Sequence, residues 1–112
     1  MGMAAAGGPR MTIPTQLLLR ALLEDPAQQM YGVEIGAAAG LPSGTVHPIL
    51  ARLEGLRWLE SQWEDIDPRA AGRPARRYYR LTTGGVEQAR AALARAYRPS
   101  RASSLRPATE QT

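Results

Sequence analysis

Residues 43–56 read SGTVHPILARLEGL and carry the clearest helical periodicity of the chain. Apolar side chains recur there with the i, i+3, i+4, i+7 spacing that places them on one face of an α-helix: Val46, Ile49, Leu50, Leu53 and Leu56. The first residues of the stretch are instead small or polar and able to form hydrogen bonds: Ser43, Gly44, Thr45 and His47. The pattern predicts a helix with one buried face and a polar start that is free to contact a ligand.

The residues just before this helix predict a shorter helix and a tight turn. Residues 31–39 read YGVEIGAAA, and Gly40 is placed to end that helix, because helices commonly close on a left-handed glycine. Residues 41–44 (LPSG) form the turn. Pro48 leaves the start of the longer helix open, since a helix from Ser43 loses a backbone hydrogen bond there and one from about Thr45 does not.

An earlier helix is predicted from Thr12, a candidate N-cap, to the residue before Pro26. Its leucines at positions 17, 18, 19, 22 and 23 cover more than one face. We therefore expect this helix to pack against two surfaces, one of them a candidate contact with a partner subunit.

After Leu56 the period changes from helical towards two. Residues 59–65 alternate, with Leu59 and Trp63 on the apolar face, and residues 76–81 form a second strand with Tyr79 and Leu81 inside. A loop with two prolines and a glycine joins them into an antiparallel hairpin. Trp58 and Trp63 are expected to be core or interface anchors, Trp63 with the better claim to the core. A last helix runs from Thr82 to about Tyr97.

Charge is segregated along this hairpin. Between Arg69 and Arg80 there are five arginines and no acid, whereas residues 54–67 hold five acids and one arginine. Arginine-rich hairpin tips commonly contact phosphates or enter a narrow minor groove of DNA. The alternative is a solvated loop whose arginines pair with the neighbouring acidic strand.

Length and composition set limits on the rest. The 112 residues suit a single domain, and the net charge of +4, with 14 arginines and no lysine, favours a polyanionic partner. The absence of cysteine and the single histidine argue against a structural zinc site, so we expect no metal and no cofactor. His47 lacks a neighbouring carboxylate or nucleophile in sequence, and we expect no enzymatic activity.

The two ends differ from the middle in composition. Residues 1–11 are expected to form a flexible arm, and residues 98–112 a disordered basic tail around a folded unit at 12–97. No apolar run is long enough for a membrane helix, and the arm does not resemble a signal peptide, so a cytoplasmic protein is expected.

The order of elements indicates a mainly α (α+β) winged helix-turn-helix with three helices, a two-stranded β-wing and a C-terminal helix. In that architecture the third helix enters the major groove of DNA by its N-terminal end. The wing is the hairpin of residues 59–81.

Three strings carry a resemblance to a known family: YGVEI at 31–35, SGTVHPILARLE at 43–54 and GRPARRYYRLT at 72–82. The chain resembles the PadR-like transcriptional regulators. The resemblance implies a homodimeric repressor of an inverted repeat in double-stranded DNA near its own promoter. Within the strings, DNA contacts are expected from Tyr31, Ser43, Gly44, Thr45, His47, Arg52, Arg73, Arg76 and Arg77.

Departures from the family pattern limit what carries over. Position 47 is usually tyrosine in the family, and the chain ends before the further helical domain of longer relatives, which points to the short subfamily. There the first and last helices form the dimer, here through Leu17, Leu18, Leu22, Leu93 and Tyr97. Some short relatives bind a flat aromatic effector at this interface with a tryptophan of the last helix. Only Tyr97 is available here, so an effector is the weakest expectation.

The alternative function is a winged-helix protein-interaction module without sequence-specific DNA binding, because this fold serves both purposes. The arginine-rich wing favours DNA.

Overall fold

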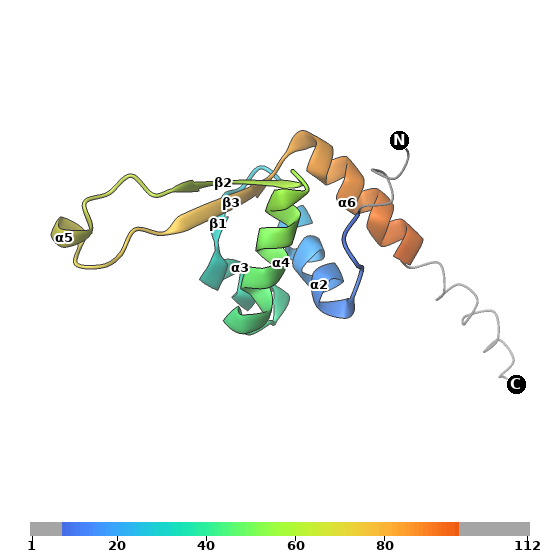
Figure 1. The fold of residues 1–112 in the computed structure, drawn as a ribbon, viewed down its shortest axis with the longest axis horizontal. Coiled ribbons are helices and arrows are strands. Elements are labelled where there is room, and N and C mark those ends of the chain that lie inside the picture. The colour runs from blue at the N-terminus through green and yellow to red at the C-terminus, as the bar shows by residue number, and fades with distance from the viewer. Residues whose placement is uncertain (1–7, 97–112) are drawn as a thin grey trace, which may run out of the picture.

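In a computed structural model of the protein, residues 8–96 are described, and these form five helices and a three-stranded antiparallel sheet (Figure 1). The helices are α2 (Ile13–Leu23), α3 (Gly32–Ala39), α4 (Ser43–Gly55), α5 (Pro68–Ala71) and α6 (Thr83–Ala96). The strands are β1 (Met30–Tyr31), β2 (Leu59–Trp63) and β3 (Arg77–Leu81), in the order β1-β3-β2. The predicted winged helix is confirmed, with two elements that the sequence did not predict.

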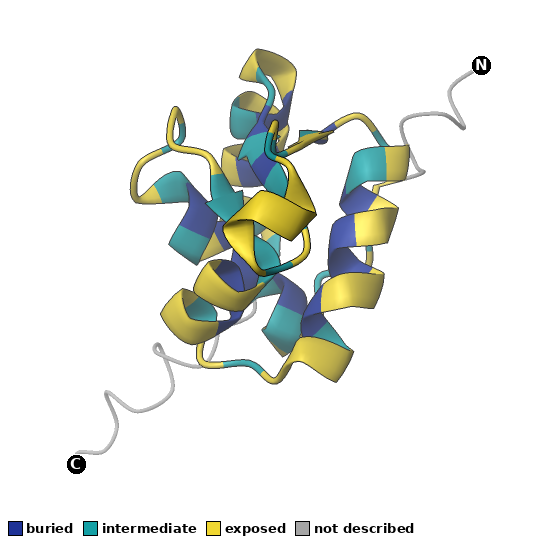
Figure 2. Ribbon diagram, turned by 90° about the vertical axis from the view of Figure 1, so that its left-hand side faces the viewer, coloured by how far each residue is buried: buried dark blue, intermediate teal, exposed yellow. Residues whose placement is uncertain are grey.

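The core lies where α2, α3 and α4 meet the base of the sheet. Figure 2 shows the buried faces of these helices turned towards one another. The side chains with no exposed surface include Leu18, Leu19, Ile35, Leu50 and Leu53. Removing this apolar surface from water is the dominant favourable contribution to folding. The core therefore fixes the orientation of α4, whose polar start is at the surface.

Backbone chemistry explains where the helices begin and end. The Thr12 hydroxyl caps α2 by accepting from the Thr15 N–H, and Gly40 ends α3 in the left-handed region at a φ of 73°. Helix α4 begins at Ser43, capped by the backbone of Pro42, so Pro48 lies inside it. The open question about Pro48 is thus answered: its missing N–H leaves one hydrogen bond of α4 unmade.

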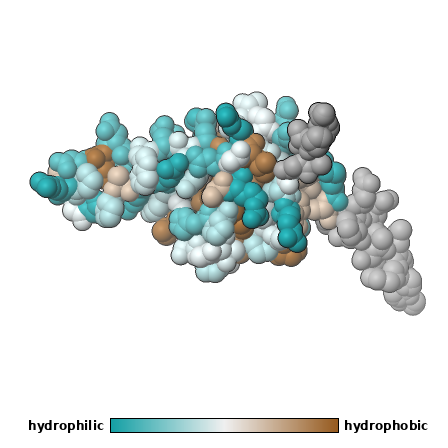
Figure 3. All heavy atoms as spheres, viewed as in Figure 1, coloured by the Kyte–Doolittle hydropathy of each residue, from teal (hydrophilic) through white to brown (hydrophobic). Residues whose placement is uncertain are grey.

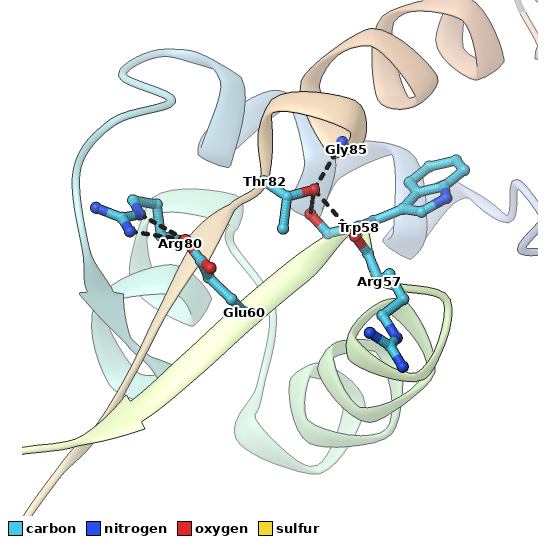
Figure 4. A network of polar contacts seen from close by, with 6 residues as sticks. All are labelled: Arg57, Trp58, Glu60, Arg80, Thr82 and Gly85. Carbon is cyan, nitrogen blue, oxygen red and sulfur yellow. Dashed lines mark hydrogen bonds and ion pairs between the residues drawn. The ribbon is translucent and has the colours of Figure 1, made fainter.

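Helix α6 begins at a close junction with the start of β2 (Figure 4). The Thr82 hydroxyl accepts from the Gly85 N–H at 2.8 Å and donates to the carbonyl of Arg57 at 2.9 Å. A Cβ on Gly85 would overlap the carbonyl oxygen of Trp58, whereas one on Gly84 would meet nothing. Gly85 is therefore required for close approach, although the sequence shows it only as a poor helix former.

The wing projects away from the helical body, and its far end is largely hydrophilic (Figures 1 and 3). Strands β2 and β3 pair from Leu59↔Leu81 to Trp63↔Arg77. Tyr79 and Leu81 are buried, as predicted. The expected irregular loop instead contains α5, capped by the Asp67 side chain and closed by Gly72 at a φ of 71°.

Two expectations about this region are corrected. Trp63 is 61 % exposed and Trp58 is the core tryptophan, at 6 %. Trp63 does share a face with Leu59, but at that point the hairpin has passed beyond the helices that would cover it. The sheet also has a third strand, since Met30 and Tyr31 pair with Tyr79 and Tyr78. Two residues are too few to show a strand periodicity in sequence.

Candidate nucleic-acid interface

Helix α4 presents one exposed stripe opposite its buried face. Val46, Leu50 and Leu53 have no exposed surface. Rotated away from them lie the exposed residues Ser43, Gly44, His47, Pro48, Ala51 and Arg52, while Thr45 is half-buried. Among residues 8–96, no acidic side chain pairs with Arg52. The start of α4 thus offers backbone N–H groups, a hydroxyl, an imidazole and a free guanidinium to a ligand.

A second group of predicted residues gathers where α3 begins. The imidazole of His47 lies against Gly32. A Cβ atom on that glycine would be only 3.0 Å from the His47 Cε1 atom. Next to it in sequence, Tyr31 makes an edge-to-face contact with Tyr78 at 5.6 Å between ring centroids. The Arg76 guanidinium lies 4.5 Å from the centre of the Tyr31 ring. The fold therefore joins Tyr31 of β1 to Tyr78 and Arg76 of the wing, beside the His47 imidazole of α4.

Three of the five wing arginines pair with carboxylates. Arg73 pairs with Glu64, Arg77 with Glu54 and Arg80 with Glu60, at 2.8, 3.2 and 2.7 Å. Figure 4 shows the last of these pairs across the two long strands. Arg69 and Arg76 form no ion pair within the part of the chain that the structure describes. The structure therefore shows the alternative that the sequence left open: these three arginines pair with acids.

Glu64 binds the two sides of the wing together just beyond the paired strands. Its carboxylate accepts from both terminal nitrogens of Arg73, at 2.8 and 2.9 Å, and from the backbone N–H of Arg76 at 3.2 Å. Its own N–H donates to the Arg76 carbonyl at 2.7 Å. The hydrogen bonds and charge of Arg73 outweigh desolvation and lower the pKa of Glu64 to about 2. The pair is therefore fully ionised at neutral pH.

A similar contact connects α4 to strands β2 and β3 of the wing. The Glu54 carboxylate accepts from the Ser61 hydroxyl at 2.5 Å and from Arg77 at 3.2 Å. These interactions lower the pKa of Glu54, the Ser61 hydrogen bond most of all. The Arg77 guanidinium in turn lies 5.3 Å from the centre of the exposed Trp63 ring. Arg77 is thus held between an acid of α4 and an aromatic ring of β2.

Comparison with known proteins places the chain in a family. The transcriptional regulator PadR-like family matches residues 19–91. The chain belongs to the PadR-like family of transcriptional regulators. Members of this family are regulators of transcription and not enzymes, as the sequence predicted. No curated protein matches the chain.

Solved structures show the same fold. A PadR family transcription regulator from Clostridium difficile R20291 is 22 % identical, with a TM-score of 0.60 over 80 % of this chain and 92 % of that one. A PadR-like regulator from Bacillus cereus ATCC 14579 is 16 % identical, with a TM-score of 0.61 over 87 % and 92 %. Overoxidized AbfR, solved bound to DNA, is 26 % identical, with a TM-score of 0.59 over 90 % and 70 %. The first two structures show the same fold, and the family match together with the DNA-bound AbfR structure agrees with a DNA-binding regulator.

The sequence left open whether the wing arginines of this PadR-like chain pair with the acids of residues 54–67, and it did not indicate which acids would pair with which arginines. The antiparallel register locates one of the pairs, because it sets Glu60 opposite Arg80. It also extends to Glu64 opposite Arg76, but the ion-pair partner of Glu64 is Arg73, within the loop. The Glu54 contact comes from a different helix, which strand pairing alone does not indicate.

The residues expected at a dimer interface lie in different environments. Leu18 and Leu22 are part of the protomer's own core, at 0 % and 3 % exposed, so neither is available to a second subunit. Leu17 is 40 % exposed and Leu93 is half-buried on α6. Tyr97 lies outside the described residues.

An open groove runs along α6 beside Trp58. Its volume is about 420 Å³, and residues 8–11 and α6 form its walls. The side chain of Gln16 donates to the Met11 carbonyl, and Met11 packs on the core, so the last part of the predicted arm lies against the body.

In the described part of the chain, no helix is both long and apolar enough to cross a membrane.

Proposed function

We propose that the protein is a homodimeric, cytoplasmic transcriptional repressor that binds an inverted-repeat operator near its own promoter. The observation that carries this proposal is the exposed stripe of α4. One face of the helix is locked in the core, and the other presents Gly44, His47 and Arg52 at the surface without acidic partners in the described part of the chain.

In this proposal the start of α4 reads bases and the surrounding groups hold the backbone. Ser43, Thr45 and His47 face base edges of the major groove, and Arg52 contacts a guanine or a phosphate. Tyr31 and Arg76 contact phosphates beside the same groove. Arg77 stays paired to Glu54 and adds to the positive potential that attracts the DNA phosphates.

The dimer is proposed to form through α2 and α6. Leu17 and Leu93 are at the surface of these helices, and Ile13 is 66 % exposed on the same helix as Leu17. A folded unit this small gains stability by burying such side chains against a second copy. Leu17→Arg is expected to yield a monomer in analytical ultracentrifugation, and an unchanged sedimentation coefficient would contradict this interface.

The test is fluorescence anisotropy of the protein on 30-bp duplexes tiled upstream of its own gene, with scrambled duplexes as controls. One tile is expected to bind about 1,000-fold more tightly than its scrambled control. Its half-sites should lie about one helical turn apart.

Three variants separate the roles. Thr45→Ala is expected to change which base pairs are preferred, whereas Arg52→Ala or Arg76→Ala should weaken tight and scrambled duplexes alike if they contact phosphate. Each lost phosphate contact should reduce the slope of log affinity against log salt by about 0.9. Equal, weak binding to every tile would contradict the proposal and favour a protein-interaction module.

A further inference from the structure

We propose that Glu64 and Arg73 form a clamp that positions the wing tip (residues 65–75), and that Arg73 is a positioning residue and not a phosphate contact. The inference deepens the proposed function, since it rests on the wing meeting DNA. It assigns a role to an acid on the arginine-rich wing of a protein that binds a polyanion.

The clamp lies at the point where strand pairing stops. Paired residues end at Trp63↔Arg77, and one further backbone bond joins Glu64 to Arg76. Beyond it the Glu64 carboxylate is bound by Arg73 from within the loop and by the Arg76 N–H from β3's side. A single side chain thus joins the start of the loop to two points near its end. Without it, the last backbone bond would still join the loop to the strands, and the loop would keep the internal bonds of α5.

Arg73 is already engaged in the way that a phosphate would engage it. Both terminal nitrogens face the Glu64 oxygens in a two-pronged pair, and one also donates to the Pro74 carbonyl at 3.2 Å. This fork geometry is the same one that arginine offers to phosphate. Moving Arg73 to DNA would break both of its hydrogen bonds to Glu64 and leave that negatively charged carboxylate unpaired near the phosphates. Arg73 is therefore better placed to hold the loop than to leave it.

The clamp orients an arginine that is free to reach DNA. Arg69 lies on α5, is exposed, and has no ion pair among residues 8–96. Its backbone is fixed by the Asp67 cap, with the Arg69 N–H donating to the Asp67 side chain at 3.0 Å. The wing tip consequently presents Arg69, while Arg73 stays inside the loop.

The test compares Glu64→Gln, Arg73→Gln and the double variant on the duplex that the wild type binds best. Each single variant is expected to weaken binding by about two- to five-fold, and the double variant no further, because residues that act through one contact are not additive. Glu60→Gln is the matched control. It removes the same charge from the same side of the hairpin and breaks the Arg80 pair, but the Glu60 carboxylate binds only the Arg80 side chain and does not close the loop. It is expected to leave affinity within two-fold or to raise it.

The opposite sign overturns the proposal. If Arg73 were a phosphate contact, Glu64→Gln would release it and tighten binding while Arg73→Gln weakened it. Arg73→Lys also distinguishes a phosphate contact from a positioning role, because lysine still binds phosphate as a point charge but cannot reproduce the two-pronged pair. We expect Arg73→Lys to behave like Arg73→Gln, and wild-type affinity in Arg73→Lys would contradict the clamp.

A readout without DNA separates this proposal from the proposed function. Glu64→Gln should speed hydrogen exchange of the Arg76 amide and tryptic cleavage after Arg69 by several-fold, with an unchanged melting temperature, and Glu60→Gln should change neither rate. Unchanged rates in Glu64→Gln would refute the clamp even if the wild type binds its operator. If the wild type binds no tile, the proposed function fails, and these rates still decide whether the clamp exists.

Discussion

Helix α4 buries Val46, Leu50 and Leu53 completely in the helical body, whereas the projecting wing is held by pairs such as Glu64–Arg73 that remain partly hydrated. Apolar burial is non-directional and is not screened by salt, whereas ion pairs at a surface are screened. A polyanion can also compete with the carboxylates for the wing arginines, but it cannot replace the apolar contacts of the core. We therefore expect the body to act as a rigid support and the wing to be the part that responds to salt, pH and DNA.

The largest expected effect is in the body. Leu50→Ala should lower the free energy of unfolding by about 2–5 kcal/mol, because it removes a fully buried side chain and leaves a cavity. Urea denaturation followed by circular dichroism measures it. Val33→Ala is the control, since Val33 is 69 % exposed, and should stay within about 0.5 kcal/mol. Equal losses in both variants would mean that the α4 face is not the core of this protein.

The next effect tests the junction between the body and α6. Gly85→Ala should destabilise the protein by about 1–3 kcal/mol, since its Cβ would overlap the Trp58 carbonyl and force the helix away. Gly84→Ala, one residue earlier in the same helix turn, should instead stabilise by up to about 1 kcal/mol, because alanine is the better helix former and has space there. Thermal unfolding of the two variants compares them, and the same sign for both would contradict the close approach at Gly85.

A smaller effect is expected where α4 meets the wing. Glu54→Ala removes the acceptor of Ser61 and Arg77 and should cost less than about 1 kcal/mol, because the pair is partly exposed. Amide exchange in β2 and β3 should rise around Ser61 and Arg77 while that of α4 residues is unchanged. Glu87→Ala on the exposed side of α6 is the control, and a wing that exchanges alike in both variants would refute the connection.

The finest test is the response of the wing to acid. A carboxylate whose pKa is lowered on folding stabilises the fold above its ordinary pKa and loses that contribution as pH falls through the lowered value. For Glu64 the contribution is present above about pH 4.5 and is lost on approach to about pH 2. The NMR shift of the Arg76 amide should titrate with a midpoint near 2, while the Leu50 methyl shifts stay constant. A midpoint near 4.5 would show that Arg73 does not hold Glu64 in solution.

Strong local patterns explain which parts of the fold could be predicted. The spacing of Val46, Ile49, Leu50 and Leu53 predicts α4 and its buried face, and Thr12 and Gly40 mark helix ends that the structure confirms. The alternation around Tyr79 and Leu81 likewise predicts the inner face of β3. In each case the physical requirement is met by residues that are near one another in sequence.

Patterns failed where a residue's environment depends on distant parts of the chain. Trp63 has the right periodicity for burial, but no helix extends far enough to cover it. Leu18 and Leu22 could belong to a dimer interface or to the core, since both are apolar, and the protomer itself buries them. Five arginines without an acid between them left two readings open, a free basic surface or arginines paired with neighbouring acids. Acids from α4, from β2 and from the residue after β2 pair with three of the arginines.

The sequence alone therefore determined the winged helix and its PadR-like strings, because helix periodicity, caps and strand alternation are set by neighbouring residues. Only the tertiary structure decided which arginines are free. Ion pairs form between residues 9 to 23 positions apart, and antiparallel pairing and helix packing bring those residues together. The net charge of the wing is a property of its composition, but the field that it presents to DNA depends on which charges the fold has already paired.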